Sequence, residues 1–285
     1  EVCGLFLLAL IYRLLIGFAL AAAIGYLGYR RRALNRSGVV GAIITGGIIF
    51  GFGGLSGAAL LLAFFVSSSA LSRFGETQKE ALAEKFSKNS QRDMAQALAN
   101  GGAAALSIIG YPLTHHPAWW AAFAASLAAA NADTWATELG VLSRTPPRLI
   151  TNGKIVEVGT SGGVSLLGTQ AAFSGSLLVA IIAYLAALFD PTLSVLRPSA
   201  SLLLTTIAFA GLLGSLFDSL LGATVQAIYF CDPCQKETER YPTHRCGAQT
   251  RMFRGWGWLD NDWVNFLATT IGAVLAALVF SGFSG

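Results

Sequence analysis

Long apolar stretches, separated by short charged loops, constrain most strongly what this chain can fold into. A helix needs about 20 mainly apolar residues to cross the hydrocarbon core of a bilayer. The second stretch is short and rich in glycine, so it could be a re-entrant element instead of a full span. The sequence therefore predicts an all-α, polytopic membrane helical bundle with about eight transmembrane spans, or seven to eight. The expected spans lie near residues 4–29, 38–53, 56–73, 93–110, 118–140, 163–189, 201–229 and 258–282.

The composition argues against a water-soluble protein. Only 12% of the residues are charged and 54% are hydrophobic, whereas a soluble domain carries about 25% charged residues. Because the charged stretches are short loops between spans, we expect residues 1–285 to form a single integral membrane domain. Its one distinct insertion is a small cytoplasmic Cys/His hairpin at 230–257. The expected surroundings are the membrane bilayer, without nucleic acid, and the oligomeric state is left open.

The distribution of Lys and Arg predicts the orientation in the membrane. Of the 19 cationic residues, 17 lie in the loops at 30–37, 74–92, 141–162 and 230–257 or, like Arg73, at the border of one, and only Arg13 and Arg197 lie elsewhere. With eight spans, these four loops all fall on one side of the bilayer. Cytoplasmic loops carry an excess of Lys and Arg, so this side is expected to be cytoplasmic and both termini outside.

Four carboxylates lie within the expected spans, each in the half that adjoins the basic loops: Asp133, Glu138, Asp218 and Asp262. An ionisable residue at the centre of a span costs about 2.5–3.5 kcal/mol on insertion scales, so each requires a structural or functional reason. Other polar residues share helix faces with these carboxylates or lead into the fourth span at four-residue spacing. They are Arg92, Gln96, Asn100, Asn131, Thr134, Ser215, Ser219, Asn261 and Asn265.

Three explanations fit these polar stripes. The simplest is that the side chains hydrogen-bond to one another and hold the helices together. However, several carboxylates on one side repel one another unless they are protonated or bridged by a cation. We expect Asp133, Asp218 and Asp262 to hold Mg²⁺, a hard cation that prefers oxygen ligands and often shares them with phosphates. A proton or Na⁺ pathway is the rival use of the same residues.

A loop of small residues before the sixth span has features of a phosphate-binding site. Accessible backbone N–H groups and a helix N-terminus both favour an anion, and basic side chains nearby would add charge. A flexible turn is the alternative interpretation. The loop residues are Thr160, Ser161, Gly162 and Gly163, and the basic residues expected to assist are Arg148 and Lys154.

The hairpin at 230–257 contains four soft ligands, Cys231, Cys234, His244 and Cys246. The first two have CxxC spacing, and three Cys with one His can bind structural Zn²⁺. Free thiols are the alternative, because a second complete CxxC is missing. If zinc binds, it would fix Asp218 and Asp262 relative to each other, since the hairpin joins their two spans.

The motifs that contain these residues resemble the phytyl-phosphate kinase family of plant vitamin E synthesis and its prokaryotic and animal transmembrane relatives. The likeness runs in order through most of the chain. It rests on QALANGG (96–102), NADTWATELGVLS (131–143), PRLIT (147–151), GTSGGVSLLG (159–168), GSLFDSLLGATVQ (214–226) and NDWVNF (261–266).

The resemblance implies a kinase that transfers the γ-phosphoryl group of CTP, or another nucleotide, to an isoprenoid phosphate lipid such as phytyl or geranylgeranyl phosphate. Phosphoryl transfer depends mainly on positioning and charge neutralisation, which agrees with the residues above. Glu138 would be a Mg²⁺ ligand or a neighbour of one, and the nine other polar residues of the helix stripes would bind the nucleotide or a phosphate. Two alternatives remain: a CTP-dependent cytidylyltransferase that makes a CDP-lipid, and an ion-coupled membrane transporter.

Overall fold

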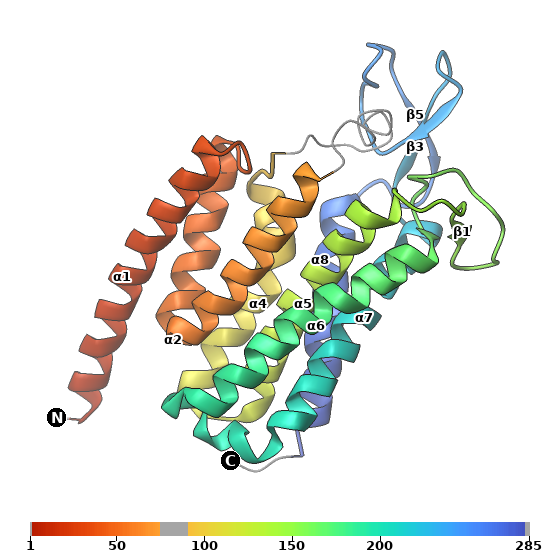
Figure 1. Cartoon of the computed structure of the whole chain (residues 1–285). Helices are drawn as coiled ribbons and strands as arrows, with labels where there is room; N and C mark the ends of the chain where they lie inside the picture. The colour runs from red at the N-terminus through yellow and green to blue at the C-terminus, as the bar shows by residue number, and fades with distance from the viewer. Residues whose placement is uncertain (1, 75–90, 283–285) are drawn as a thin grey trace.

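The computed structural model describes residues 2–74 and 91–282, and most of the predicted basic loop at 74–92 lies outside these ranges. The described part is a bundle of long α-helices (Figure 1) with two small β-sheets at one end. The short helix η1, Pro191–Ser199, precedes the seventh long segment. The α-helices are α1 (Val2–Arg30), α2 (Arg36–Arg73), α4 (Met94–Thr114), α5 (Pro117–Gly140), α6 (Leu166–Phe189), α7 (Ala200–Thr224) and α8 (Asn261–Phe280).

Helix α2 doubles back on itself at Gly54, so it supplies two antiparallel arms (Figure 1). Gly54 has φ 59° and ψ −151°, a conformation that is essentially restricted to glycine. A Cβ atom at Gly46 would lie 3.8 Å from the Leu61 side chain, which is possible only if the arms pack side by side. The arms correspond to the two expected spans at 38–53 and 56–73. Counted separately, they give eight helical segments in the described part, in agreement with the predicted seven to eight.

The ends of some expected spans differ in the structure. The sixth helix begins at Leu166, after a loop that Ser165 closes by capping Gly168 N–H. The seventh ends at Thr224 rather than near 229, because residues 228–231 form a β-strand instead. A side chain that accepts a hydrogen bond from the free N–H groups of the first turn stabilises the start of a helix. Ser165 is a residue type that favours this position, so the sequence already contained a signal for the observed start.

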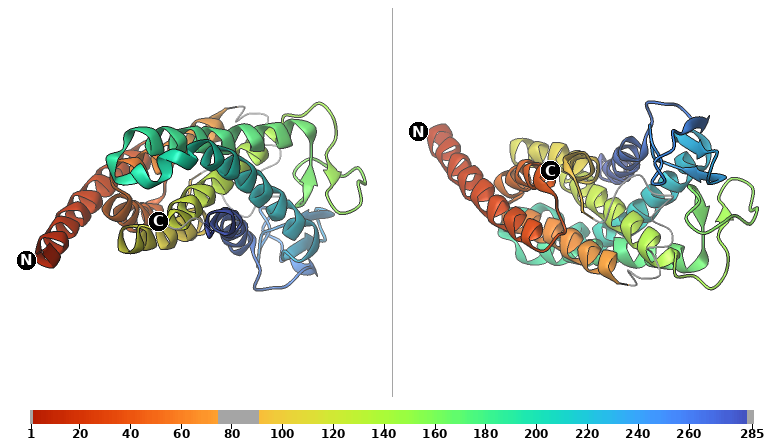
Figure 2. Two further views of the ribbon diagram at one scale, coloured as in Figure 1. Left: turned by 90° about the horizontal axis from the view of Figure 1, so that it is seen from below. Right: turned by 90° about the horizontal axis from the view of Figure 1, so that it is seen from above.

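Helix α5 lies at the centre of the bundle and packs against α4, α6, α7 and α8 (Figure 2). Its residues 120–132 are all buried, and most of them are alanine. Small side chains let neighbouring membrane helices approach closely, and a helix that is apolar on every side belongs in an interior. Helix α1 is peripheral and packs mainly on α2 (Figure 2).

The surface of the bundle is that of a membrane protein. Five helical segments of the described residues are long and apolar enough to cross a bilayer: Leu8–Arg30, Arg36–Arg73, Leu166–Phe189, Pro191–Thr224 and Asn261–Phe280. Large apolar side chains such as Leu15, Leu55 and Leu278 are more than half exposed on its outside. A soluble monomer rarely exposes so much apolar surface, whereas lipid tails accommodate it.

The two β-sheets lie at the end of the bundle opposite both termini (Figure 1). Strands β1 (Arg148–Leu149) and β2 (Gly163–Val164) pair antiparallel within the loop between α5 and α6. Strands β3 (Ile228–Cys231), β4 (Lys236–Thr238) and β5 (Arg251–Arg254) form a three-stranded antiparallel sheet in the order β4-β3-β5. This hairpin unit connects α7 to α8 and folds over the end of the bundle.

The turn in α2 generates the first prediction. Gly54→Ala should destabilise the protein by about 1–3 kcal/mol, because a side chain at that φ and ψ is strained. We expect a lower midpoint of thermal unfolding in detergent. Gly257→Ala is the control, since a Cβ there meets nothing closer than 4.0 Å. Equal midpoints for the two variants would show that the turn does not require glycine.

Candidate active site

A polar cavity of about 1060 Å³ opens at the end of the bundle that carries the β-sheets. All of the long helices except α1 line it, together with the loop before α6 and the hairpin before α8. It contains most of the residues that the sequence singled out. These are Arg92, Gln96, Asn100, Asp133, Thr134, Glu138, Thr160, Ser161, Gly162, Gly163, Ser215, Asp218, Ser219, Asn261 and Asn265.

Carboxylates from two central helices meet in this cavity. Asp133 of α5 is hydrogen-bonded to Ser215 of α7, and Asp218 follows one turn later on the same helix. Asp133 and Asp218 interact electrostatically with each other and with Glu239 of the hairpin. One oxygen of Asp218 is buried and has no hydrogen-bond partner among the described residues. Like-charged carboxylates so placed favour a bound cation or proton.

Asp262 differs from these carboxylates. In the described structure Asn261 and Asn265 of α8 line the cavity and Asp262 does not. Residues four apart share a helix face, whereas the neighbouring residue projects about 100° away. The expected role of Asp262 as a third Mg²⁺ ligand therefore gains no support from the cavity, and it stays a prediction.

The loop from Thr160 to Gly163 lies against the end of α7. Gly162 has φ 83°, and a Cβ atom there would collide with the backbone of Ala223. A Cβ at Gly222 would lie 2.7 Å from Ser161 Oγ. Glycine on both sides of the contact is therefore what lets the loop lie on the helix and face the cavity.

Hydrogen bonds tie this loop to the hairpin. Ser161 Oγ donates to Gln226 Oε1 at 2.6 Å, and Gln226 Nε2 donates to Glu239 Oε1 at 3.0 Å. Arg254 Nη1 donates to the carbonyl of Gly222 at 2.8 Å, so strand β5 is also fixed to the end of α7. Burial lowers the pKa of the Arg254 guanidinium, which remains close to the carboxylates Glu237 and Glu239.

Arg92 brings a buried positive charge to the cavity. Its guanidinium lies 5.2 Å from the centre of the Phe64 ring, and its Nη1 is buried without a hydrogen-bond partner among the described residues. Burial lowers the pKa of Arg92 to about 10, opposed by the charge of Glu138. Because this pKa is well above 7, the group is charged at neutral pH and has a donor available for an anion. Glu138 accepts a 2.6 Å hydrogen bond from Ser72 Oγ.

Three expected phosphate-binding residues lie elsewhere in the described structure. Asn131 is fully buried, and its amide accepts from Ser67 and Ser68 and donates to the Gly175 carbonyl. It therefore ties α2, α5 and α6 together, and no phosphate has access to it. Arg148 is exposed and donates to the carbonyl of Gly153 at 2.9 Å. Lys154 is exposed as well.

Several cavity residues were not identified as site residues from the sequence. The polar stripe of α7 included Gln226 at the right spacing, but nothing in the sequence near Glu239 or Arg245 points to the cavity. Arg31, Arg32 and Arg73 lie at the ends of the first two helices, where positive charges are already explained by the orientation of the protein in the membrane. The polar residues that the structure adds are Arg31, Arg32, Ser69, Ser72, Arg73, Gln91, Thr137, Ser165, Thr169, Gln226, Glu239 and Arg245.

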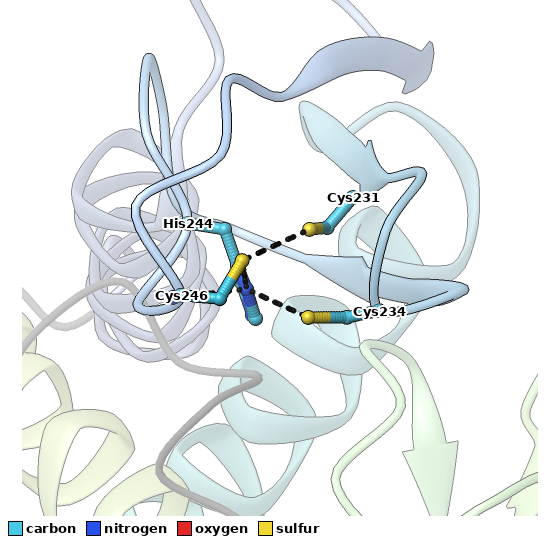
Figure 3. A group of neighbouring side chains, drawn as sticks. All are labelled: Cys231, Cys234, His244 and Cys246. Carbon is cyan, nitrogen blue, oxygen red and sulfur yellow. Dashed lines mark hydrogen bonds between the residues drawn. The ribbon is translucent and has the colours of Figure 1, made fainter.

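The four soft ligands of the hairpin converge, as Figure 3 shows, and their ligand atoms all lie within 4.8 Å of one another. His244 Nδ1 lies 3.2 Å from Cys246 Sγ and 3.5 Å from Cys234 Sγ, and Cys231 Sγ lies 3.6 Å from Cys246 Sγ. Ligands about 2.0–2.3 Å from a tetrahedral ion are separated by similar distances. The cluster is therefore able to hold a metal ion.

The thiols also show why a cation suits this cluster. The hydrogen bond with His244 lowers the pKa of Cys246 to about 6. Contacts with Cys246 and Cys231 raise the pKa of Cys234 to about 12. Thiolates that lie side by side oppose one another by like charge. A metal ion removes this conflict because it binds the deprotonated sulfur.

Comparison with known proteins identifies the family. The integral membrane protein family DUF92 matches residues 19–273. The chain belongs to this family. The chain also has relatives in Arabidopsis thaliana and Methanocaldococcus jannaschii, so the resemblance drawn from the motifs holds at the family level. No solved structure shows significant similarity to the chain.

Three relatives illustrate the similarity of the chain to known proteins. Protein PGR of Arabidopsis thaliana is 33% identical over 282 residues, which cover 94% of this chain and 96% of the relative. The uncharacterized membrane protein MJ0933 of Methanocaldococcus jannaschii is 31% identical over 274 residues, 94% of each chain. Protein VTE6, chloroplastic, of Arabidopsis thaliana is 26% identical over 254 residues, which cover 86% of this chain and 65% of the relative.

The packing of the loop on α7 generates a second prediction. Gly162→Ala should lower the thermal midpoint in detergent, because its Cβ would push the loop away from Ala223. Gly153→Ala is a matched control in the same loop: its φ is also positive, 69°, but the space around it is open. Both variants carry the strain of a positive φ, so only the collision distinguishes them. A midpoint for Gly162→Ala no lower than that of Gly153→Ala would contradict this contact.

Proposed function

We propose that this protein is a membrane prenyl-phosphate kinase. It transfers the γ-phosphoryl group of CTP, or another nucleoside triphosphate, to an isoprenoid monophosphate such as phytyl or geranylgeranyl phosphate. The proposal is supported by membership of the DUF92 family, by similarity to Protein VTE6, chloroplastic, and by the motif resemblance to phytyl-phosphate kinases.

One observation carries the proposal: a single cavity combines converging carboxylates with groups suited to binding phosphate. Asp133 and Asp218 lie on α5 and α7, and the small-residue loop from Thr160 to Gly163 lies beside them. Carboxylates alone would suit a proton or Na⁺ pathway. The glycine-rich loop and the buried charge of Arg92 add sites for anions, which phosphoryl transfer requires and simple cation transport does not.

The residues then have defined roles. Mg²⁺, when bound by Asp133 and Asp218, would neutralise charge on the nucleotide phosphates. The loop N–H groups and Arg92 hold phosphate oxygens, with Gln96 and Asn100 alongside. An oxygen of the prenyl phosphate attacks the γ-phosphorus, and the bond to the β,γ-bridging oxygen breaks. The products are a prenyl diphosphate and a nucleoside diphosphate. The acceptor phosphate is already anionic near neutral pH, so no strong general base is needed.

The position of the cavity fits a substrate that is part lipid and part polar. The cavity lies at the end of the bundle where the basic loops gather, which we place on the cytoplasmic side by the positive-inside rule. The nucleotide would enter from that side, and the isoprenoid tail would lie between helices toward the lipid. Both termini, at the opposite end, would then be outside.

We assign the metal of the hairpin cluster as Zn²⁺ in a structural role. Three thiols and one imidazole are soft ligands that zinc accepts in tetrahedral geometry. All four protein ligands are supplied by one short hairpin, so no position remains for a substrate, which is typical of a structural site.

Replacing either central carboxylate should abolish turnover. Asp133→Asn and Asp218→Asn each remove one charged ligand while they retain the side-chain shape. We expect kcat/KM to fall by at least about 100-fold, the effect of losing one preorganised electrostatic group. The measurement is Mg²⁺-dependent transfer of label from γ-labelled CTP to geranylgeranyl phosphate. Asp232→Asn, an exposed residue paired with Arg251, is the control.

The destination of the label separates the alternatives. Label in the lipid supports the kinase, and label in released pyrophosphate indicates a cytidylyltransferase. Substrate flux through proteoliposomes without nucleotide, lost in Asp218→Asn, indicates a transporter. If both carboxylate variants keep full phosphotransfer in correctly folded protein, these residues are not the catalytic ones.

A further inference from the structure

The hairpin between α7 and α8 forms part of the cavity wall. Two of its residues, Glu239 and Arg245, line the cavity. The carboxylate of Glu239 lies close enough to Asp133 and Asp218 to interact with both electrostatically, and it accepts a hydrogen bond from Gln226. The opposite charges of Glu239 and Arg245 match the two components of a nucleotide bound with a divalent cation.

The metal-ligating cluster is built into the same segment. Arg245 stands between two ligands, His244 and Cys246, so coordination would fix the chain on both sides of it. Glu239 is in the stretch between Cys234 and His244. Each of the two cavity residues is therefore bounded on both sides by ligands of one cluster.

Strand pairing provides a rigid connection from the cluster to Glu239. Cys231, a buried ligand, pairs with Lys236 at the start of β4, and Tyr229 pairs with Thr238 at its end. Thr238 is buried, and Glu239 follows directly. An isolated pair of strands is only marginally stable, so a metal ion at one end of the β3–β4 pair would hold the other end in place.

We propose that the metal-bound hairpin is a working part of the substrate site: it presents Glu239 to the divalent cation and Arg245 to the phosphates of a nucleoside triphosphate. This inference rests on the proposed function for the identity of the ligand. It adds that the hairpin metal governs nucleotide affinity and that two residues outside the membrane helices bind substrate. Glu239 completes a set of three carboxylates from α5, α7 and the hairpin.

The first test distinguishes the effect of losing the metal from the effect of replacing the ligand residue His244. His244→Cys keeps four soft ligands, whereas His244→Ala leaves three. We expect His244→Cys to retain about one zinc per chain by mass spectrometry, and to bind CTP with Mg²⁺ like the wild type. His244→Ala should lose zinc and weaken CTP binding by about 10–100-fold, the range seen when support around a metal site is removed. Equal CTP affinity with and without zinc would overturn the inference.

The second test leaves every metal ligand in place, so it decides the question even if His244→Ala fails to fold. Glu239→Gln removes the charge but can still accept from Gln226. It should raise the Mg²⁺ concentration needed for half-maximal CTP binding. Glu237→Gln is the control: this exposed residue of β4 does not line the cavity in the described structure. If the two variants behave alike, Glu239 does not face the cation.

Arg245→Ala tests the phosphate contact. Its affinity for CTP should fall by about 10–100-fold, as expected for the loss of a charged hydrogen bond worth about 1.5–3 kcal/mol. Zinc content should not change, because the ligands are intact. Arg251→Ala, an exposed arginine of the same hairpin that pairs with Asp232, is the control and should bind CTP normally. Unchanged affinity in Arg245→Ala would refute this contact.

The outcomes distinguish the inference from the proposed function. Phosphotransfer with normal CTP affinity in zinc-free protein would leave the kinase standing and refute the hairpin role. Zinc-dependent CTP binding without transfer of the γ-phosphoryl group to prenyl phosphate would support the hairpin role and refute the kinase.

Discussion

Like-charged carboxylates held together at one end of a membrane bundle are the constraint on which the rest of this structure depends. Asp133 and Asp218 belong to helices that cross the interior, and Glu239 reaches them from a hairpin outside the bundle. Their repulsion is unfavourable in a medium of low dielectric constant. The surroundings compensate with hydroxyl and amide donors, Ser215 to Asp133 and Gln226 to Glu239, and with a cavity large enough for a cation and its ligands.

Packing in the apolar part of the bundle is what makes this convergence possible. Helix α5 is surrounded by neighbours because alanine occupies most of its central turns. Gly214 of α7 lies so close to Ala129 of α5 that a Cβ would come within 2.7 Å of it. Short distances between these helix axes bring Asp133, one turn further along α5, into hydrogen-bond contact with Ser215, the next residue of α7. The arrangement of the carboxylates is therefore set by the close approach of small residues in the buried part of the bundle.

The sequence predicted much of the cavity because several of its elements are local. Residues four apart must share a helix face, so the polar stripes of α4, α5 and α7 follow directly from residue spacing. The same rule explains a limit: it groups Asn261 with Asn265 but cannot say whether that face or the one bearing Asp262 turns toward the cavity. Asn131 was also ambiguous, because a buried amide serves equally well as a ligand or as a tie between helices.

By itself, the sequence predicted a helical membrane bundle of about eight segments, with its motifs and most of its cations on one side. Those features follow from the lengths of apolar stretches and from the charges of the loops between them, which are properties of neighbouring residues. Only the tertiary structure decided that Glu239 and Arg245 join the cavity and that Arg148 and Lys154 do not. Their positions depend on how the hairpin and the loop before α6 dock on the end of α7, which is fixed by contacts between residues far apart in the chain.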